Sequence, residues 1–141
     1  MKISEAGLDL IREHEGCRLE AYRDSVGVLT LGYGHTRGVK AGDTCTPMQA
    51  DEWLREDIHH AETCVDKCVS VPLTQGEFDA LVSFAVNLGC GALRGSTLLR
   101  LVNDGRMDDA AEQFGRWNHA GGIELAGLTA RRKAEQELFE T

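Results

Sequence analysis

Strand-forming residues are concentrated in one short stretch of the chain, and this feature most limits the folds available to it. The run Val28–Leu31 favours strand, and Gly32 and Gly34 interrupt it. We predict a small antiparallel hairpin or three-stranded sheet over about residues 18–36. From Thr46 onward the pattern is helical to the end of the chain. Strands and helices are therefore segregated, which indicates an α+β, mainly helical fold.

Helix boundaries are marked by local signals. Ser4 is a suitable cap for a first helix, and Gly16 is a natural stop, so Glu15 is expected in its last turn. Capping-box patterns at Thr46 and Thr74 open a long helix and a second, mostly buried one that ends at Gly89. Further helices are predicted at Ser96–Asn103, from Asp108 to about Trp117, and from Thr129 to about Phe139.

The length of 141 residues fits one domain, 1–141. We expect two lobes, one containing the strands (about 15–46) and one helical (1–14 and 70–141), joined by the long helix 47–69. A cleft between two such lobes is the default place for a ligand site.

Charge and hydropathy exclude several classes of protein. The net charge is −8, and the densest basic run, residues 130–135, lies beside acids and is interpreted as a solvated helix face. The sequence has no basic stripe of the kind that binds nucleic acid, so a nucleic-acid partner is not expected. No apolar run reaches the ~20 residues that cross a bilayer, and no signal peptide is recognised, so stable membrane insertion is not expected.

Five cysteines leave at least one thiol unpaired in a monomer: Cys17, Cys45, Cys64, Cys68 and Cys90. His60, Cys64 and Cys68 share one helical face, with Cys45 upstream, and this set is a candidate zinc site. The simpler interpretation is that the cysteines are small buried hydrophobic residues. We expect neither a metal nor a cofactor.

Glu15 and Asp24 are candidates for glycosidic acid–base chemistry. Such cleavage needs one carboxylic acid to protonate the leaving oxygen and a second carboxylate to handle the water or the sugar cation. A helix C-terminus disfavours an ionised Glu15, and Thr30, in the following strand, has a hydroxyl that can orient a water beside Asp24. Taken alone, two acids nine residues apart are more simply surface charges, with Asp24-Ser25 favouring a turn.

The full string "HEGCRLEAYRDSVGVLTLGYGHT" (residues 14–36) resembles the opening of the phage-type lysozymes, the endolysins of glycoside hydrolase family 24. Glu15-Gly16, Tyr22, Asp24, Thr30 and Gly32-Tyr33-Gly34-His35 match the family motif without a gap. The likeness continues in "VPLTQGEFDALVSFAVNLGCGALRGSTLLRLVNDG", "AAEQFGRW" and "RRKAEQELF". It therefore covers nearly the whole chain.

The resemblance implies a lysozyme-like fold and an inverting muramidase that cuts the β-1,4 bond between N-acetylmuramic acid and N-acetylglucosamine in bacterial peptidoglycan. Glu15 would be the general acid, with Asp24 and Thr30 holding the attacking water. Arg131 would pair with Glu15, and Asn87 would lie where relatives bind sugar through an amide.

The resemblance also makes His35 a buried structural histidine. It implies a phage or prophage enzyme, expected to be monomeric, that is held in the host cytoplasm until release and acts on periplasmic peptidoglycan. Many relatives are basic, so this acidic chain is expected to be attracted more weakly to anionic walls. A disulfide from Cys64 or Cys68 to Cys90 would join two helices if these pack together.

Rival interpretations remain open. One is a peptidoglycan-binding module without activity on the same fold. Another is a lytic transglycosylase, which would use Glu15 without needing Asp24 as a water-holding base. A third is a thiol- or zinc-dependent regulatory domain built on the cysteines.

Overall fold

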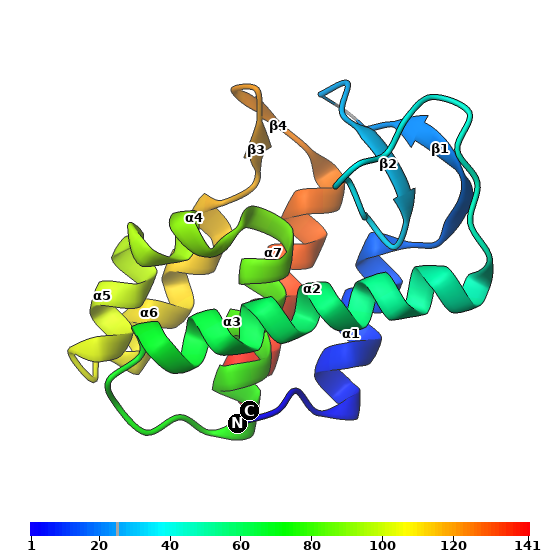
Figure 1. Ribbon diagram of the computed structural model, residues 1–141. Helices are drawn as coiled ribbons and strands as arrows, with labels where there is room; N and C mark the ends of the chain where they lie inside the picture. The colour runs from blue at the N-terminus through cyan, green and yellow to red at the C-terminus, as the bar shows by residue number, and fades with distance from the viewer. Residues whose placement is uncertain (25) are drawn as a thin grey trace.

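The computed structural model describes residues 1–24 and 26–141, so Ser25 of the predicted turn lies outside the described residues. Figure 1 shows the strands β1 and β2 packed near one end of the long helix α2, with the short helices α4, α5 and α6 toward its other end. The elements run in the order α1 (Glu5–Glu15), β1 (Arg18–Arg23), β2 (Leu29–Gly32), α2 (Pro47–Cys68), α3 (Gln75–Leu88), α4 (Cys90–Arg94), α5 (Thr97–Asn103), α6 (Met107–Gln113), the 3-10 helix η1 (Phe114–Arg116), β3 (His119–Ala120), β4 (Ile123–Glu124) and α7 (Ala126–Phe139).

The predicted helix starts of α1, α2 and α3 are confirmed by their caps. The Ser4 hydroxyl accepts a hydrogen bond from the Gly7 amide at the start of α1. Thr46 and Thr74 each form a complete capping box with the residue three positions on. These interactions join neighbouring residues, so each satisfies helix-end amides without help from the rest of the fold.

The predicted hairpin is present as two strands. β1 and β2 are antiparallel, with Tyr22 opposite Thr30 and an irregularity in register between Arg18 and Tyr22. In place of a third strand, an isolated bridge joins Glu20 to Thr44. The register sets Tyr22 and Thr30 side by side near the turn that contains Asp24.

Helix α3 lies at the centre of the hydrophobic core, as its broad apolar face predicted. Every residue from Phe78 to Ala85 is buried. The helix packs against α1, α2, α4 and α7. Its last turn thereby comes close to the end of α1 and to α7, the two helices that contribute Glu15 and Arg131.

The segment before the last helix departs from the prediction of a loop followed by a helix from Thr129. Residues 119–124 form the small hairpin β3–β4, because Gly121 and Gly122 both adopt positive φ in its two-residue turn. Helix α7 begins three residues early, at Ala126, after a cap residue, Leu125, that makes no side-chain bond. Thr129 instead donates its hydroxyl to the Leu125 carbonyl inside the first turn.

Two shorter helical segments also differ from expectation. The helix α4 was not predicted, because Gly89 and Gly91 suggested only a break. The helix expected from Asp108 to Trp117 is divided into α6 and η1. Among the described residues, none of the helices has the length and apolar character needed to span a membrane.

Candidate active site

A cavity of about 390 Å³ lies between the β1–β2 hairpin, the end of α1 and the end of α3. It brings together four of the residues singled out in the sequence, Glu15, Asp24, Thr30 and Asn87. The cavity is polar, and its lining residues are His14, Glu15, Tyr22, Asp24, Thr30, Tyr33, Gly34, Thr36, Asp57, Val86 and Asn87.

Glu15 is the last residue of α1 and faces Arg131 of α7. The Arg131 Nη1 donates to Glu15 Oε1 over 2.5 Å, and the Glu15 side chain is 14% exposed. Arg131 also donates to the Ser83 carbonyl, and its Nε lies 3.4 Å from a Glu135 oxygen. Arg131 is thus fixed by α3 and by its own helix, and the predicted pairing with Glu15 is present.

Asp24 is held at the hairpin turn by backbone donors. Its Oδ1 accepts from the amides of Val26 at 3.0 Å and Val28 at 2.8 Å. The Gly27 amide donates to the Asp24 carbonyl. Among the described residues, none donates to Oδ2, so that oxygen is available to accept a proton or a water hydrogen bond.

Thr30 is 4% exposed and lies in β2 opposite Tyr22. Its hydroxyl donates to the Val28 carbonyl over 2.9 Å. Because the hydroxyl proton of Thr30 is used in this bond, the hydroxyl oxygen can only accept hydrogen bonds from other donors. A water in the cavity is such a donor.

Asn87 is in the last turn of α3 and lines the cavity between Glu15 and Val86. Its Oδ1 is buried and has no hydrogen-bond partner among the described residues. Buried amide oxygens are nearly always bonded. An unpaired acceptor at the cavity wall therefore suits a ligand that brings a hydroxyl or amide donor.

His35 is only half-buried, so the expectation of a buried histidine is wrong. Its ring stacks on Trp53 of α2, with centroids 4.4 Å apart. It lines a second cavity of about 280 Å³ that shares Gly34, Thr36 and Asp57 with the first.

Asp57 was not predicted and lines both of these cavities from α2. Burial raises the pKa of its carboxyl above the usual range, while His35, Arg37 and His60 act in the opposite direction. The signal available in the sequence was the spacing of one helical turn from Trp53, which places both side chains on the face that meets the hairpin.

A third cavity, of about 380 Å³, lies on the other side of Glu15. His14 and Asn87 are shared with the first cavity, and Arg131, Leu125 and Leu128 form the far wall. Burial, and next the charge of Arg131, lower the pKa of His14. Neighbouring cavities share lining residues, and Glu15 lines both the first and the third.

The basic run 130–135 is not a solvated helix face. Arg131 is 3% exposed, and Arg132 and Glu135 are fully buried. Glu135 accepts from Arg132 at 2.9 Å and from the Ser83 hydroxyl at 2.5 Å. The sequence pattern missed this cluster because its burial depends on Ser83, which is 52 residues away in the chain.

The cysteines are arranged differently from the candidate zinc set. Cys64 forms a disulfide with Cys90, one of the two pairings considered. Cys45 is packed with Leu31 and Ala50 in a separate core cluster near the hairpin. The candidate set of His60, Cys64, Cys68 and Cys45 is therefore not assembled.

This fold and site define a lysozyme. The model of the family described as phage lysozyme matches residues 12–135, and the chain belongs to that family. The resemblance noted in the sequence is thereby confirmed.

Individual relatives support the assignment. The chain is 43% identical to an endolysin of Acyrthosiphon pisum secondary endosymbiont phage 1, covering 100% of this chain and 99% of that one. It is 44% identical to an endolysin of Bacillus phage PZA, covering 100% of this chain and 56% of that one. Among solved structures, the muramidase domain of SpmX from Asticaccaulis excentricus superposes with a TM-score of 0.89 at 42% identity, covering 99% and 98% of the two chains.

Proposed function

We propose that the chain is a muramidase that hydrolyses the β-1,4 bond between N-acetylmuramic acid and N-acetylglucosamine in peptidoglycan. The observation that supports this most is the single cavity lined by Glu15, Asp24 and Thr30, which come from a helix end, a turn and a strand. Membership of the phage lysozyme family agrees with it.

The proposed reaction starts with substrate displacing the contact between Glu15 and Arg131. The protonated Glu15 carboxyl gives its proton to the glycosidic oxygen as the bond to the anomeric carbon breaks. A water held by Asp24 Oδ2 and the Thr30 oxygen attacks that carbon from the opposite face and gives its proton to Asp24. This sequence of steps inverts the anomeric configuration.

The cavities on either side of Glu15 suit a chain-like substrate. Asn87 lies in the wall shared by the first and third cavities and offers an unpaired amide oxygen to sugar hydroxyl or acetamido groups. Residues 1–141 act as one unit in this proposal, with the hairpin lobe and the helical lobe forming opposite sides of the glycan site.

The biological role that fits is lysis of a bacterial host by a phage or prophage. The proposed enzyme is a monomer that is made in the host cytoplasm and reaches peptidoglycan in the periplasm. Its net charge of −8 predicts little long-range attraction to anionic walls from outside the cell.

The test is digestion of purified peptidoglycan by wild type, Glu15→Gln and Asp24→Asn, with the product ends identified by mass. Reducing muramic ends from the wild type, lost in both folded variants, would support hydrolysis with these roles. Anhydro-muramic ends would identify a lytic transglycosylase instead. Wall binding without cleavage would identify a binding module, and an active, folded Glu15→Gln would reject the mechanism.

A further inference from the structure

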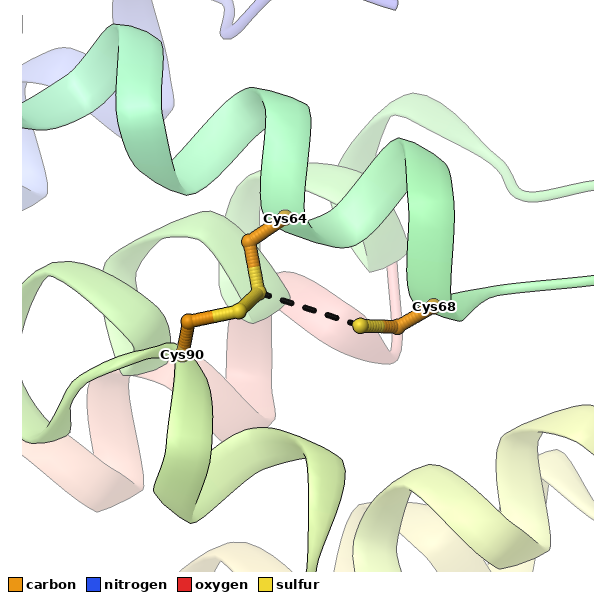
Figure 2. Close-up of side chains that lie close together, drawn as sticks. All are labelled: Cys64, Cys68 and Cys90. Carbon is orange, nitrogen blue, oxygen red and sulfur yellow. Dashed lines mark hydrogen bonds between the residues drawn. A yellow bond between two sulfur atoms is a disulfide. The ribbon is translucent and has the colours of Figure 1, made fainter.

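Three cysteine sulfurs lie together where α2 meets α4. Cys90 also lines the second cavity, but none of the three cysteines lines the cavity that contains Glu15 and Asp24. Cys64 is bonded to Cys90, and the free thiol of Cys68 lies 3.8 Å from the Cys64 sulfur (Figure 2). All three sulfurs lie within 4.8 Å of one another. The disulfide thus uses two members of a group of three.

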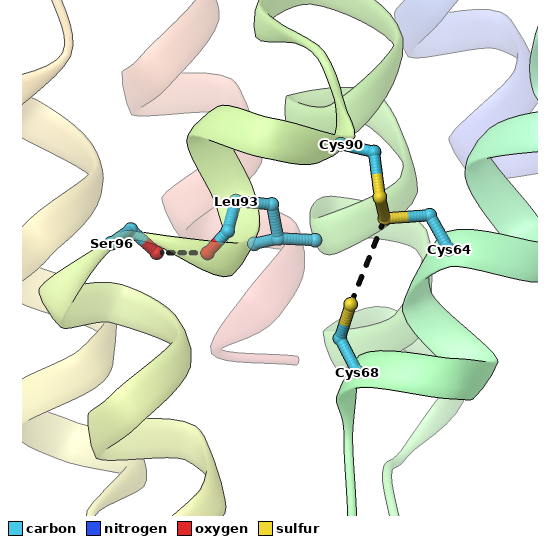
Figure 3. Close-up of a disulfide and its surroundings, with 5 residues drawn as sticks. All are labelled: Cys64, Cys68, Cys90, Leu93 and Ser96. Carbon is cyan, nitrogen blue, oxygen red and sulfur yellow. Dashed lines mark hydrogen bonds between the residues drawn. A yellow bond between two sulfur atoms is a disulfide. The ribbon is translucent and has the colours of Figure 1, made fainter.

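Helix geometry and hydrogen bonds fix the backbone of the three cysteines. Cys64 and Cys68 are one turn apart on the same face of α2, and Cys90 is the first residue of α4 (Figure 3). Asn103 of α5 donates to the Cys68 carbonyl over 3.0 Å, which anchors the end of α2. Ser96 donates its hydroxyl to the Leu93 carbonyl, so its proton is already used in a bond to the end of α4.

The separation of the Cys64 and Cys68 sulfurs matches that of two thiolates around one metal ion. With metal–sulfur bonds of ~2.3 Å in tetrahedral geometry, two ligand sulfurs lie ~3.8 Å apart. The Cys64 and Cys68 sulfurs already have this separation. After reduction, van der Waals repulsion separates the Cys64 and Cys90 sulfurs to a similar distance.

The surroundings favour a soft ion. Cys64 is buried in the main core, and Cys68 and Cys90 are packed against it while half-buried, which leaves access from solvent. Thiolate ligands select zinc and cuprous copper over hard cations. Three sulfurs leave a fourth position of a tetrahedral ion for water.

We propose that Cys64, Cys68 and Cys90 of the reduced protein bind one thiophilic d10 cation, and that this ion replaces the disulfide as the link between α2 and α4. A phosphine reductant takes the disulfide to two thiols and is itself oxidised, with water, to the phosphine oxide. The three thiols then release three protons, and each sulfur forms one bond to the ion. The link between the helices is covalent in the oxidised chain and coordinate in the reduced chain.

The test titrates the full chain with Cd²⁺ and Zn²⁺ under anaerobic conditions, before and after reduction by a phosphine. We expect one equivalent to bind only after reduction, with sulfur-to-cadmium charge-transfer absorption and an increase in Tm over the reduced, metal-free protein. Cys68→Ser should weaken binding at least ~100-fold. Because this variant keeps the disulfide, its oxidised form should match wild type in Tm and in activity on cell walls.

Cys17→Ser is the matched control, because it removes an exposed free thiol outside the cluster and should leave binding unchanged. Equal binding by reduced wild type and reduced Cys68→Ser would overturn the proposal, as would no binding by the reduced wild type. Binding is measured without any substrate, so its outcome is independent of the proposed muramidase activity.

Discussion

Arg131 contacts Glu15 through an Nη1–Oε1 distance of 2.5 Å, and the two side chains are only 4% and 14% exposed. Arg131 is itself held by the Ser83 carbonyl, so this contact sets where the Glu15 carboxyl lies in the cavity. In the proposed mechanism, substrate has to displace this contact before Glu15 can reach the leaving oxygen.

Replacing Arg131 by Gln is expected to lower kcat, because the Nη1 donor that positions the Glu15 carboxyl is lost. A misplaced catalytic group costs ~100-fold in rate. The measurement is kcat and KM on soluble peptidoglycan fragments, with Tm as the check on folding. Arg116→Gln removes the same charge from an exposed position and should leave kcat unchanged. A fall in Tm with unchanged kcat for Arg131→Gln would mean that Arg131 acts only through folding.

Gly34→Ala is expected to abolish activity because a Cβ at this position would overlap Glu15 Oε2. Gly38→Ala provides the matched control. Both glycines have positive φ, 78° and 71°, but a Cβ at Gly38 meets nothing within 4 Å. Each variant should lose ~1–2 kcal/mol of unfolding free energy through backbone strain. Only Gly34→Ala should lose turnover, and equal activity of the two would show that Glu15 does not need this space.

Thr30→Val and Thr30→Ser separate the hydroxyl of Thr30 from its packing. Val keeps the shape but removes the oxygen proposed to hold water, so kcat should fall ~100-fold or more. Stability should fall by only about 1 kcal/mol with the lost bond to Val28. Ser keeps the oxygen and should retain most of the activity. A fully active Thr30→Val would remove Thr30 from the mechanism.

How far the sequence predicts this structure depends on the range of the interactions involved. The starts of α2 and α3 were predictable because each capping box joins residues three apart. The start of α7 was not, because Leu125 makes no side-chain cap and the adjacent hairpin sets its position through a bond from the Leu125 amide to the Asn118 carbonyl. The sequence shows the caps formed by neighbouring residues, but it does not show the contact between the β3–β4 segment and the start of α7.

The same distinction applies to the site. Glu15 and Asp24 taken alone were more simply surface charges, and it was the resemblance to a family that singled them out together with Thr30. One cavity contains all three. Asp57 was missed because α2 meets the hairpin only in the folded chain. The charges of Arg132 and Glu135 were interpreted as solvated because pattern alone does not show that α3 covers them.

Glu135→Gln is expected to destabilise the protein strongly. The Glu135 carboxylate lies within 3.4 Å of both Arg131 and Arg132. An amide would leave the buried Arg132 without an anion and Arg131 with Glu15 alone. Breaking a buried ion pair in this way costs ~3–5 kcal/mol of unfolding free energy. The measurement is urea unfolding of the variant and of wild type. Glu137→Gln, on the exposed side of the same helix, should change stability by less than ~0.5 kcal/mol. A neutral result for Glu135→Gln would show that Glu135 is already protonated in the folded chain.

Asp51 gives a pH dependence of stability that is separate from the site. Its carboxylate joins α2 to α1 by a contact with Arg12 at 3.0 Å, and it also contacts Arg55 of its own helix at 3.1 Å. The hydrogen bond from Arg12 is the largest cause that holds the pKa of Asp51 below its usual 3.8. The folded state therefore binds fewer protons than the unfolded state just below pH 3.8. The stabilisation is complete above that pH and is lost as pH falls through the folded-state pKa.

Asp51→Asn is accordingly expected to unfold more easily than wild type at pH 7, by no more than ~1 kcal/mol because the ion pairs are partly exposed. The difference should shrink toward zero as pH falls below 3.8, since acid removes from the wild type the same charge that the mutation removes. Asp9→Asn, exposed on α1 and without an ion pair among the described residues, should follow wild type across the range. A stability difference for Asp51→Asn that persists below the folded-state pKa would assign the effect to packing of the side chain rather than to its charge.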